Sequence, residues 1–341
     1  MSKPDRIGVV LEAFLDHPLD EVLTWLSTEV SDVTAVEVGV GGYAPHPHCE
    51  PDDLLASEQS RRQWLANLRG HGIELDALNV WGNPLHPDAE IAVAHDGALR
   101  RAIRLAGDLG TNTIVAMAGT PAALAGDRAP VFGAGGWLPY LEGVHEQQWD
   151  DAVAPYWIQL SEFASRVNPD LRLCIELHPG TAVYNVETFE KFAALGPNLY
   201  ANLDPSHFFW MGMDAIKVVE RILSRIGHVH AKDTSFNAER LALNGLLDHR
   251  WPANPAEMPW NFSVPGHGHD EQYWNALLGA LEGSPATTIS IEHEDPFIAP
   301  AIGVPEAAAL IRRGLCTTAL GTTDEPAEIS ALTTKQGART P

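Results

Sequence analysis

Short apolar runs alternate with amphipathic stretches along most of the chain, and this alternation constrains the fold more than any other feature. It predicts eight strands, at residues 7–14, 35–40, 75–82, 112–119, 171–178, 199–207, 227–233 and 288–294. Several of these runs are apolar with almost no polar alternation, as strands covered on both faces must be. Between them, apolar residues recur at helical spacing, and several of the helical stretches end at glycine.

Eight successive strand–helix units predict an α/β protein with a (β/α)8 TIM barrel, formed as a single domain by residues 1–316. The rival fold is a doubly wound open sheet, which usually carries a glycine fingerprint after its first strand. No such fingerprint follows residues 7–14. The polar segment 317–341 has no periodicity, and we expect a flexible C-terminal tail there.

Charge and composition exclude several classes of partner. The formal net charge of −23 repels nucleic acid and anionic membranes, so we expect neither as a partner. No apolar run is long enough to span a bilayer, and the N-terminus has no signal-peptide pattern. Three scattered cysteines form neither a disulfide framework nor a zinc-knuckle pattern. These features together predict a cytoplasmic protein.

Ionisable side chains gather where the last four predicted strands end, in "CIELHPG", "NLDPSH", "HVHAKD" and "SIEHED". These ends converge at one mouth of a barrel, where uncompensated buried carboxylates would cost several kcal/mol each as an order of magnitude. Three carboxylates and one imidazole form a site that suits Mn²⁺, with Mg²⁺, Co²⁺ or Fe²⁺ as alternatives. The sequence thus predicts one divalent-metal site. Its ligands are Glu176, Asp204, His230 and Glu292.

Other polar and aromatic residues near these strand ends are expected to have structural or substrate-binding roles. Alternation along a strand is expected to turn His228 and His293 away from their ligand neighbours, towards the helices. Lys232 either pairs with Asp233 or binds substrate. Two long connections, after the fourth and seventh predicted strands, are expected at the mouth. Further candidates for substrate binding are Trp81, Trp210, Trp260 and His269.

In this order and spacing, "IELHPG", "NLDPSH", "HVHAKD", "GHGHD" and "SIEHEDP" resemble the xylose-isomerase-like TIM-barrel superfamily, the sugar phosphate isomerase/epimerase group. The resemblance runs from the first predicted strand to about residue 315. It implies metal ligands at the same four positions. It also implies acid/base roles for Glu176 and Glu292, and a substrate contact by His207.

A metal flanked by two carboxylates supports removal of a proton next to a carbonyl group. Reprotonation then gives an epimerase or an isomerase, whereas loss of a group β to the carbonyl gives a lyase. A phosphate site would need clustered arginine and lysine or a glycine-rich helix start, and neither is evident. The predicted substrate is therefore an unphosphorylated carbohydrate.

The aromatic and histidine content of the long connections resembles the C-glycoside deglycosidase α subunits of the same superfamily. That resemblance implies a lyase that cleaves the C1–aglycone bond of 3-oxo-glycosides, with Mn²⁺ bound and His145 as an acid/base residue. It also implies a small all-β partner subunit and an oligomer. The alternative is a sugar isomerase or epimerase, similar to ketose 3-epimerases. A non-catalytic sugar-binding module is the remote alternative.

Overall fold

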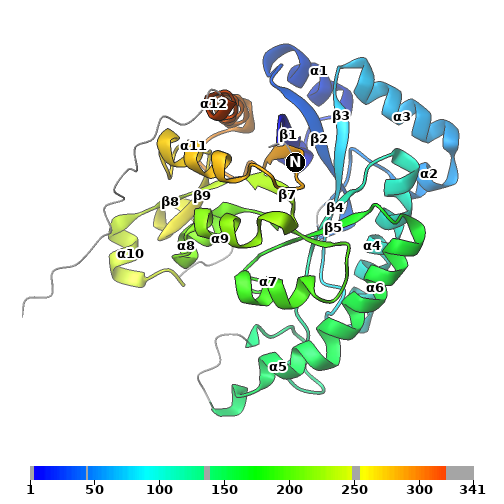
Figure 1. Cartoon of the computed structure of the whole chain (residues 1–341), viewed down its shortest axis with the longest axis vertical. Coiled ribbons are helices and arrows are strands. Elements are labelled where there is room, and N and C mark those ends of the chain that lie inside the picture. Colours follow the sequence, from blue (N-terminus) through cyan, green and yellow to red (C-terminus); the bar gives the residue numbers. More distant parts are fainter. Residues whose placement is uncertain (1–3, 44, 134–138, 248–253, 320–341) are drawn as a thin grey trace, which may run out of the picture.

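The computed structural model describes residues 4–43, 45–133, 139–247 and 254–319. Within them, eight parallel strands close into a barrel in the ring order β1-β10-β7-β6-β5-β4-β3-β2 (Figure 1). The predicted (β/α)8 fold is confirmed. The barrel strands are β1 (Arg6–Val10), β2 (Val33–Gly42), β3 (Glu74–Trp81), β4 (Thr113–Met117), β5 (Arg172–Glu176), β6 (Leu199–Leu203), β7 (Ile226–Ala231) and β10 (Thr288–Ile291).

Helices surround the barrel and pack their apolar faces on the outer side of the strands. The longest, α4 (Ala89–Leu109), begins where the Asp88 side chain accepts the Glu90 N–H and ends at Gly110, which has a φ of 81°. The others are α1 (Leu19–Glu29), α2 (Pro51–Ala56), α3 (Glu58–Gly70), α5 (Val144–Gln148), α6 (Ala154–Val167), α7 (Val186–Ala193), α8 (Pro205–Met211), α9 (Ala215–Ile222), α10 (Ala238–Asn244), α11 (Glu271–Ala280) and α12 (Pro300–Ala319).

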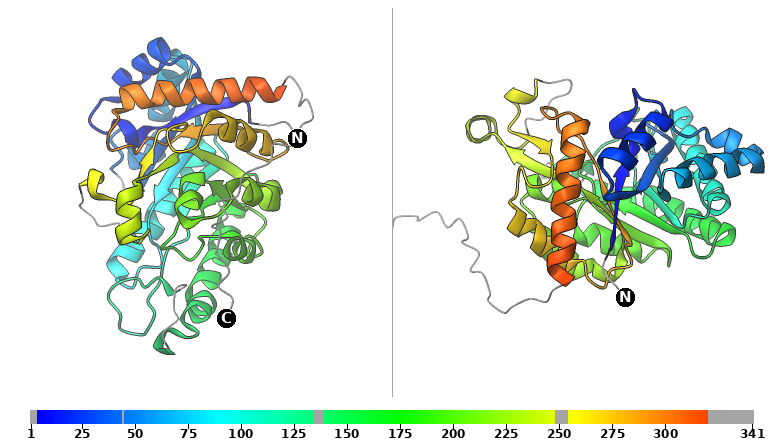
Figure 2. Two further views of the ribbon diagram at one scale, coloured as in Figure 1. Left: turned by 90° about the vertical axis from the view of Figure 1, so that its left-hand side faces the viewer. Right: turned by 90° about the horizontal axis from the view of Figure 1, so that it is seen from above.

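The last helix crosses the domain boundary that was expected at residue 316, because α12 continues to Ala319. The remaining part of the expected tail, residues 320–341, lies outside the described residues. In the views of Figure 2, α12 runs beside α11. The Arg312 guanidinium ties α12 to Asp32, 3.0 Å away in the turn before β2. Among the described helices, none is both long and apolar enough to cross a membrane.

The predicted seventh strand, 227–233, is two elements. It breaks at Lys232, and Asp233 begins a short antiparallel hairpin of β8 (Asp233–Phe236) and β9 (Trp260–Ser263). Apart from Asp233, both strands of this hairpin lie in the segment that we expected to be one long connection. Its strands are only four residues each, too short for their alternation to stand out in the sequence.

The barrel interior is polar where branched apolar side chains are usual. Glu37, Asn79, Asn202, His228 and His230 are all buried at 0–1% exposure. Buried groups of this kind are stable only when they bond to one another. The bonds they form orient the side chains at the mouth of the barrel.

Candidate metal centre

Four side chains from neighbouring barrel strands meet at the mouth. Glu176 ends β5, Asp204 follows β6, His230 lies in β7 and Glu292 follows β10. One ligand atom from each lies within 4.8 Å of the others, and the four residues are 0–4% exposed. The structure therefore brings together all four residues that the sequence predicted as metal ligands.

Neighbouring positive groups keep two of these carboxylates ionised in spite of their burial. Burial alone would raise the pKa of Glu176, but hydrogen bonds from His207, at 2.9 Å, and from His230 hold that pKa well below its usual value. Burial opposes ionisation of Asp204 as well, and the charge of Lys232 lowers its pKa. At Glu292 burial prevails, and the pKa is raised.

Lys232 lies inside this cluster. Its ammonium nitrogen is 2.7 Å from Glu292, 3.0 Å from Asp204 and 2.9 Å from Glu294, and it sits 4.4 Å above the centre of the Phe262 ring. Burial would lower the pKa of Lys232, but Asp204 and Glu292 hold it well above its usual value. The alternative that Lys232 pairs with Asp233 is therefore wrong.

The residues present fit a divalent cation. Three carboxylates, those of Glu176, Asp204 and Glu292, share this cluster with His230 and the single Lys232 ammonium, which Glu294 shares as well. Asp204 Oδ2 and Glu292 Oε2 are buried without an aligned hydrogen-bond donor, although Lys232 is close to both. Carboxylate oxygens with one imidazole are the donors that Mn²⁺, Mg²⁺ and similar ions accept.

Glu37 orients the ligand histidine from below. Its carboxylate is 3.1 Å from His230 Nε2, while His230 Nδ1 faces Glu292 at 3.1 Å and Asn202 at 3.0 Å. Burial opposes ionisation of Glu37, but the charges of His230 and His228 keep its pKa low. A carboxylate behind a ligand imidazole fixes its orientation and increases its basicity. Sequence reasoning missed Glu37, although the signal was present as one charge inside the apolar run "AVEVGV".

Substitution of Glu37 by glutamine is expected to weaken Mn²⁺ binding by about 10–100-fold, because His230 loses its charged partner. Isothermal titration of the metal-free protein with Mn²⁺ measures this change. Glu282→Gln, at an exposed position after α11, is the matched control. Equal affinities in the two variants would contradict the role assigned to Glu37.

The expectation that His228 faces the helices was wrong. Side chains two residues apart in a strand share one face, so His228 points into the barrel beneath His230. Its Nε2 is 2.6 Å from Glu37, and its Nδ1 is 3.4 Å from Asp76. Burial would lower the pKa of His228, but the Glu37 carboxylate raises it. His293, in contrast, does turn outward, and its ring donates to the Ile298 carbonyl at 2.8 Å.

His207 joins the ligand cluster from the first turn of α8. Its Nε2 donates to Glu176 at 2.9 Å and lies 3.3 Å from Asp204. The His178 ring, to which sequence analysis gave no role, is 4.2 Å from the His207 ring. Burial, together with the charge of His207, lowers the pKa of His178 to about 4, so this second imidazole stays neutral.

Aromatic rings line one side of this region. The rings of Trp210 and Trp260 stack at 4.8 Å with only 8° between their planes, and Trp260 contacts Phe262 at 5.4 Å. Phe262 in turn lies 5.4 Å from His207, which connects the stack to the cluster. Trp81 ends β3 half-buried, and among the described residues its indole N–H has no hydrogen-bond partner. The role of these rings as a sugar platform remains a prediction.

His269 contacts residues outside the metal cluster. Its Nδ1 is 2.7 Å from Asp233, and its ring packs on Phe209 and Tyr273. Asp233 also accepts the backbone N–H groups of residues 266, 268 and 269 and the indole N–H of Trp274. Burial opposes ionisation of Asp233, but these bonds, above all those from His269, lower its pKa. Asp233 thus fixes the "GHGHD" loop.

We expect Asp233→Asn to reduce the free energy of unfolding by about 2–4 kcal/mol, because an amide cannot accept all of these bonds and leaves buried donors unpaired. Urea denaturation followed by circular dichroism measures this change. The exposed residue Asp170 provides the control Asp170→Asn. A free energy of unfolding equal to that of the control would show that Asp233 does not hold this loop.

His145 lies on α5, which projects at the opposite end of the molecule from α1 (Figures 1 and 2). Its ring contacts are with Trp149 and Tyr184, both at 6.3 Å, and neither belongs to the metal cluster. Burial lowers the pKa of His145. Its acid/base role stays a prediction. The aromatic residues Trp137 and Trp251 of the long connections lie outside the described residues.

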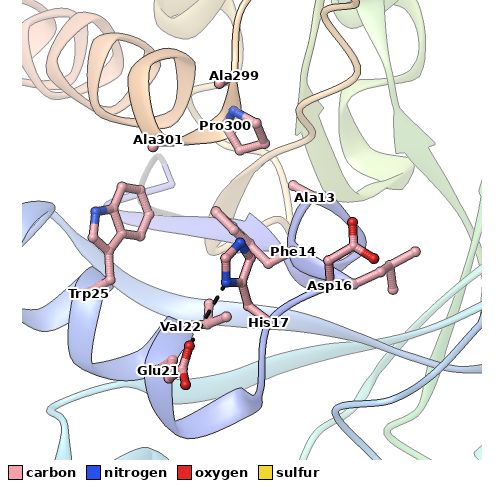
Figure 3. Close-up of a pocket in the computed structure, with 11 residues that line it drawn as sticks. Ala13, Phe14, Asp16, His17, Glu21, Val22, Trp25, Ala299, Pro300 and Ala301 are labelled. Carbon is pink, nitrogen blue, oxygen red and sulfur yellow. Dashed lines mark ion pairs between the residues drawn. The ribbon is translucent and has the colours of Figure 1, made fainter.

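A pocket of about 450 Å³ opens between the start of α1 and the start of α12 (Figure 3). His17, Trp25 and Pro300 are among the residues that line it, and His17 lies 4.0 Å from Glu21. None of the four cluster residues lines this pocket.

The fold and the cluster define a TIM barrel with a carboxylate–histidine cluster at its mouth that can hold a metal ion. The chain belongs to the xylose isomerase-like TIM barrel family, whose model matches residues 33–314. It is 32% identical over 307 residues to the uncharacterized protein YfiH of Bacillus subtilis, covering 88% of this chain and 96% of YfiH. It is also 32% identical over 100 residues to inosose dehydratase of Geobacillus kaustophilus, a match that spans 29% of this chain and 31% of that enzyme.

Solved structures of similar fold include two enzymes and a metal complex. The probable 3-DHS dehydratase AsbF of Bacillus anthracis has a TM-score of 0.60 at 13% identity, covering 92% of this chain and 99% of AsbF. The 3-keto-D-glucoside 4-epimerase YcjR of Escherichia coli has a TM-score of 0.58 at 13% identity, covering 90% of this chain and 99% of YcjR. A xylose isomerase-like TIM barrel protein of Mycobacterium smegmatis, solved in complex with magnesium, has a TM-score of 0.60 at 13% identity, covering 92% of this chain and 97% of that protein.

Proposed function

We propose that this chain is a divalent-metal-dependent enzyme that removes a proton next to the carbonyl group of an unphosphorylated keto-sugar or keto-polyol. The leading outcome is a lyase reaction, in which a group β to the carbonyl is then lost. The observation that carries the proposal is the cluster of Glu176, Asp204, His230 and Glu292, buried together at the mouth of the barrel. The partial similarity to inosose dehydratase supports an elimination.

The four cluster residues would hold the cation, which supplies stabilisation of the negative charge on the carbonyl oxygen as the neighbouring C–H bond breaks. Glu176 or Glu292 takes the proton from that carbon. The electron pair of the broken C–H bond then forms a C=C bond and expels the β group, which leaves with a proton. His207, 2.9 Å from Glu176, is within reach to supply that proton or to bind a substrate oxygen.

The leaving group defines the finer proposal. It is water in a dehydratase, and it is the C1 aglycone in the cleavage of a 3-oxo-glycoside. For the second reaction we propose His145 as an acid/base residue, Mn²⁺ as the metal and a small all-β protein as a partner. Trp210, half-buried where it stacks on the buried Trp260, supports a substrate that has an apolar or aromatic face.

A second candidate function is sugar epimerisation. Glu176 and Glu292 come from β5 and β10, which are three places apart in the barrel ring. Two carboxylates that flank one substrate carbon from opposite sides can act in turn. One removes the proton from one face of the carbon, and the other donates a proton to the opposite face. The product then keeps all its atoms, and only one stereocentre is inverted.

One experiment separates these functions. The Mn²⁺-loaded protein is incubated in D₂O with an inosose, a 3-oxo-C-glucoside or a ketohexose, and the products are followed by NMR. An unsaturated product or a free aglycone supports the lyase, and deuterium next to the carbonyl of the recovered substrate reports proton removal that was reversed. Deuterium with an inverted centre and no elimination supports the epimerase. If neither deuterium nor a product appears with any of the three compounds, the proposed function is wrong.

A further inference from the structure

The ligands of the metal centre occupy one half of the barrel mouth. They come from β5, β6, β7 and β10, which are consecutive in the ring, while the other half consists of β1, β2, β3 and β4. A substrate that spans the mouth needs polar partners on this second half as well. Glu12, two residues after the end of β1, supplies a carboxyl group there, and β1 lies directly opposite β5 in the ring.

Strand register places Glu12 level with the mouth. Val10 of β1 pairs with Glu37 of β2, and Glu12 follows in the short 3-10 helix Leu11–Phe14, with its carboxyl group beside Gly39, two residues beyond Glu37. The Glu37 side chain points into the barrel, because it bonds His228 and His230 across the interior. A side chain at Gly39 would point the same way, since residues two apart share a face of the strand.

The missing side chain at Gly39 makes room for Glu12. A Cβ atom added at Gly39 would overlap Glu12 Oε1 and would lie 3.2 Å from its Cδ. The Glu12 carboxyl group therefore fills the interior space above β2. An alanine in place of Gly39 would displace the carboxyl group without removing it.

This carboxyl group has no hydrogen-bond partner within the described residues. Both of its oxygen atoms are buried, and neither bonds to another residue in the part of the chain that the structure describes. Buried carboxyl groups are rarely left unpaired, because desolvation without a bond costs free energy. Burial, and secondarily the charge of Glu37, raises the pKa of Glu12 to about 8, so it can donate as well as accept a hydrogen bond near neutral pH.

We propose that Glu12 is a substrate-binding residue whose carboxyl group hydrogen-bonds a hydroxyl group of the polyhydroxylated ketone from the side of the mouth opposite Glu176. This inference rests on the function proposed above. Glu12 orients the substrate and leaves proton removal to the residues of the metal centre.

The first test uses whichever of the three compounds above the wild-type protein deuterates. We expect Glu12→Leu to raise KM for deuterium exchange at least tenfold, Gly39→Ala to raise it similarly, and Glu282→Gln to leave it unchanged. Mn²⁺ affinity should remain that of the wild type in all three variants. A wild-type KM in Glu12→Leu would overturn this assignment alone, whereas a wild-type protein inactive on every compound would overturn the proposed function and the assignment together.

The second test needs no substrate and uses metal-free protein. Glu12 keeps its proton in the folded chain up to a pKa of about 8 but loses it near 4.5 when unfolded, so it destabilises the fold increasingly between these pH values. The charged groups that influence it, Glu37, Glu292 and His230, are the same in wild type and Glu12→Gln. We expect equal Tm values at pH 5 and a Tm several degrees higher for Glu12→Gln at pH 8. A lower Tm for the variant at pH 8 would reveal a structural partner and overturn the assignment.

Discussion

Glu176→Gln is expected to lower turnover about 1,000-fold while the protein keeps its fold. An amide cannot take a proton from carbon, and it also removes one negative charge from the cation site. The neighbours of this position donate hydrogen bonds, His207 at 2.9 Å and Asn202 at 3.3 Å, and an amide oxygen can still accept one of them. Deuterium exchange at the substrate carbon measures the loss, and circular dichroism checks the fold.

Glu282→Gln is the control for this prediction, because the same chemical change is made at an exposed position away from the mouth. It should retain wild-type turnover and the wild-type Tm. Near-wild-type exchange by Glu176→Gln would show that this carboxylate is neither base nor essential ligand. Loss of the folded circular dichroism spectrum would assign Glu176 a structural role instead.

Removal of the metal with a chelator is expected to abolish exchange and to lower stability. A ligand present at 1,000 times its dissociation constant stabilises the folded state by about 4 kcal/mol, which corresponds to a Tm change of several degrees. The cluster explains why, since without a cation its buried carboxylates lose a partner that would offset their mutual repulsion. Thermal denaturation with increasing Mn²⁺ measures the effect.

Asp204→Asn is the matched variant for metal removal. It keeps the shape of the side chain but takes away one charged ligand, so Mn²⁺ should raise its Tm far less than that of the wild type. A wild-type Tm that does not respond to Mn²⁺, Mg²⁺, Co²⁺ or Fe²⁺ would contradict the metal site itself.

The fold and the cluster were predictable because their signals are local. Each strand–helix unit is recognisable from the periodicity of its own apolar residues. Eight such units in succession are compatible with only a few α/β topologies. Each candidate ligand lies at the end of its own strand, so the topology alone brings the four together. No distance between distant segments had to be known.

The supporting contacts could not be predicted, because they depend on pairing across the chain. Glu37 bonds His228, which lies 191 residues further along the chain. The sequence of neither segment indicates that these two side chains contact each other. Glu12 stands alone in "VVLEAF", and its place opposite Gly39 depends on the register between two strands. The inward direction of His228 is a different case, because its spacing of two from His230 already indicated a shared face.

The division of the barrel ring has a consequence for how relatives of this chain can diversify. The four candidate metal ligands lie on one arc of consecutive strands, and the segments after β1 and β4, including the projecting α5, belong to the other arc. Insertions and substitutions in the segments after β1 and β3 can therefore alter which molecule is accepted without displacing the four ligands. Selectivity and reactivity in such a barrel can evolve at separate rates.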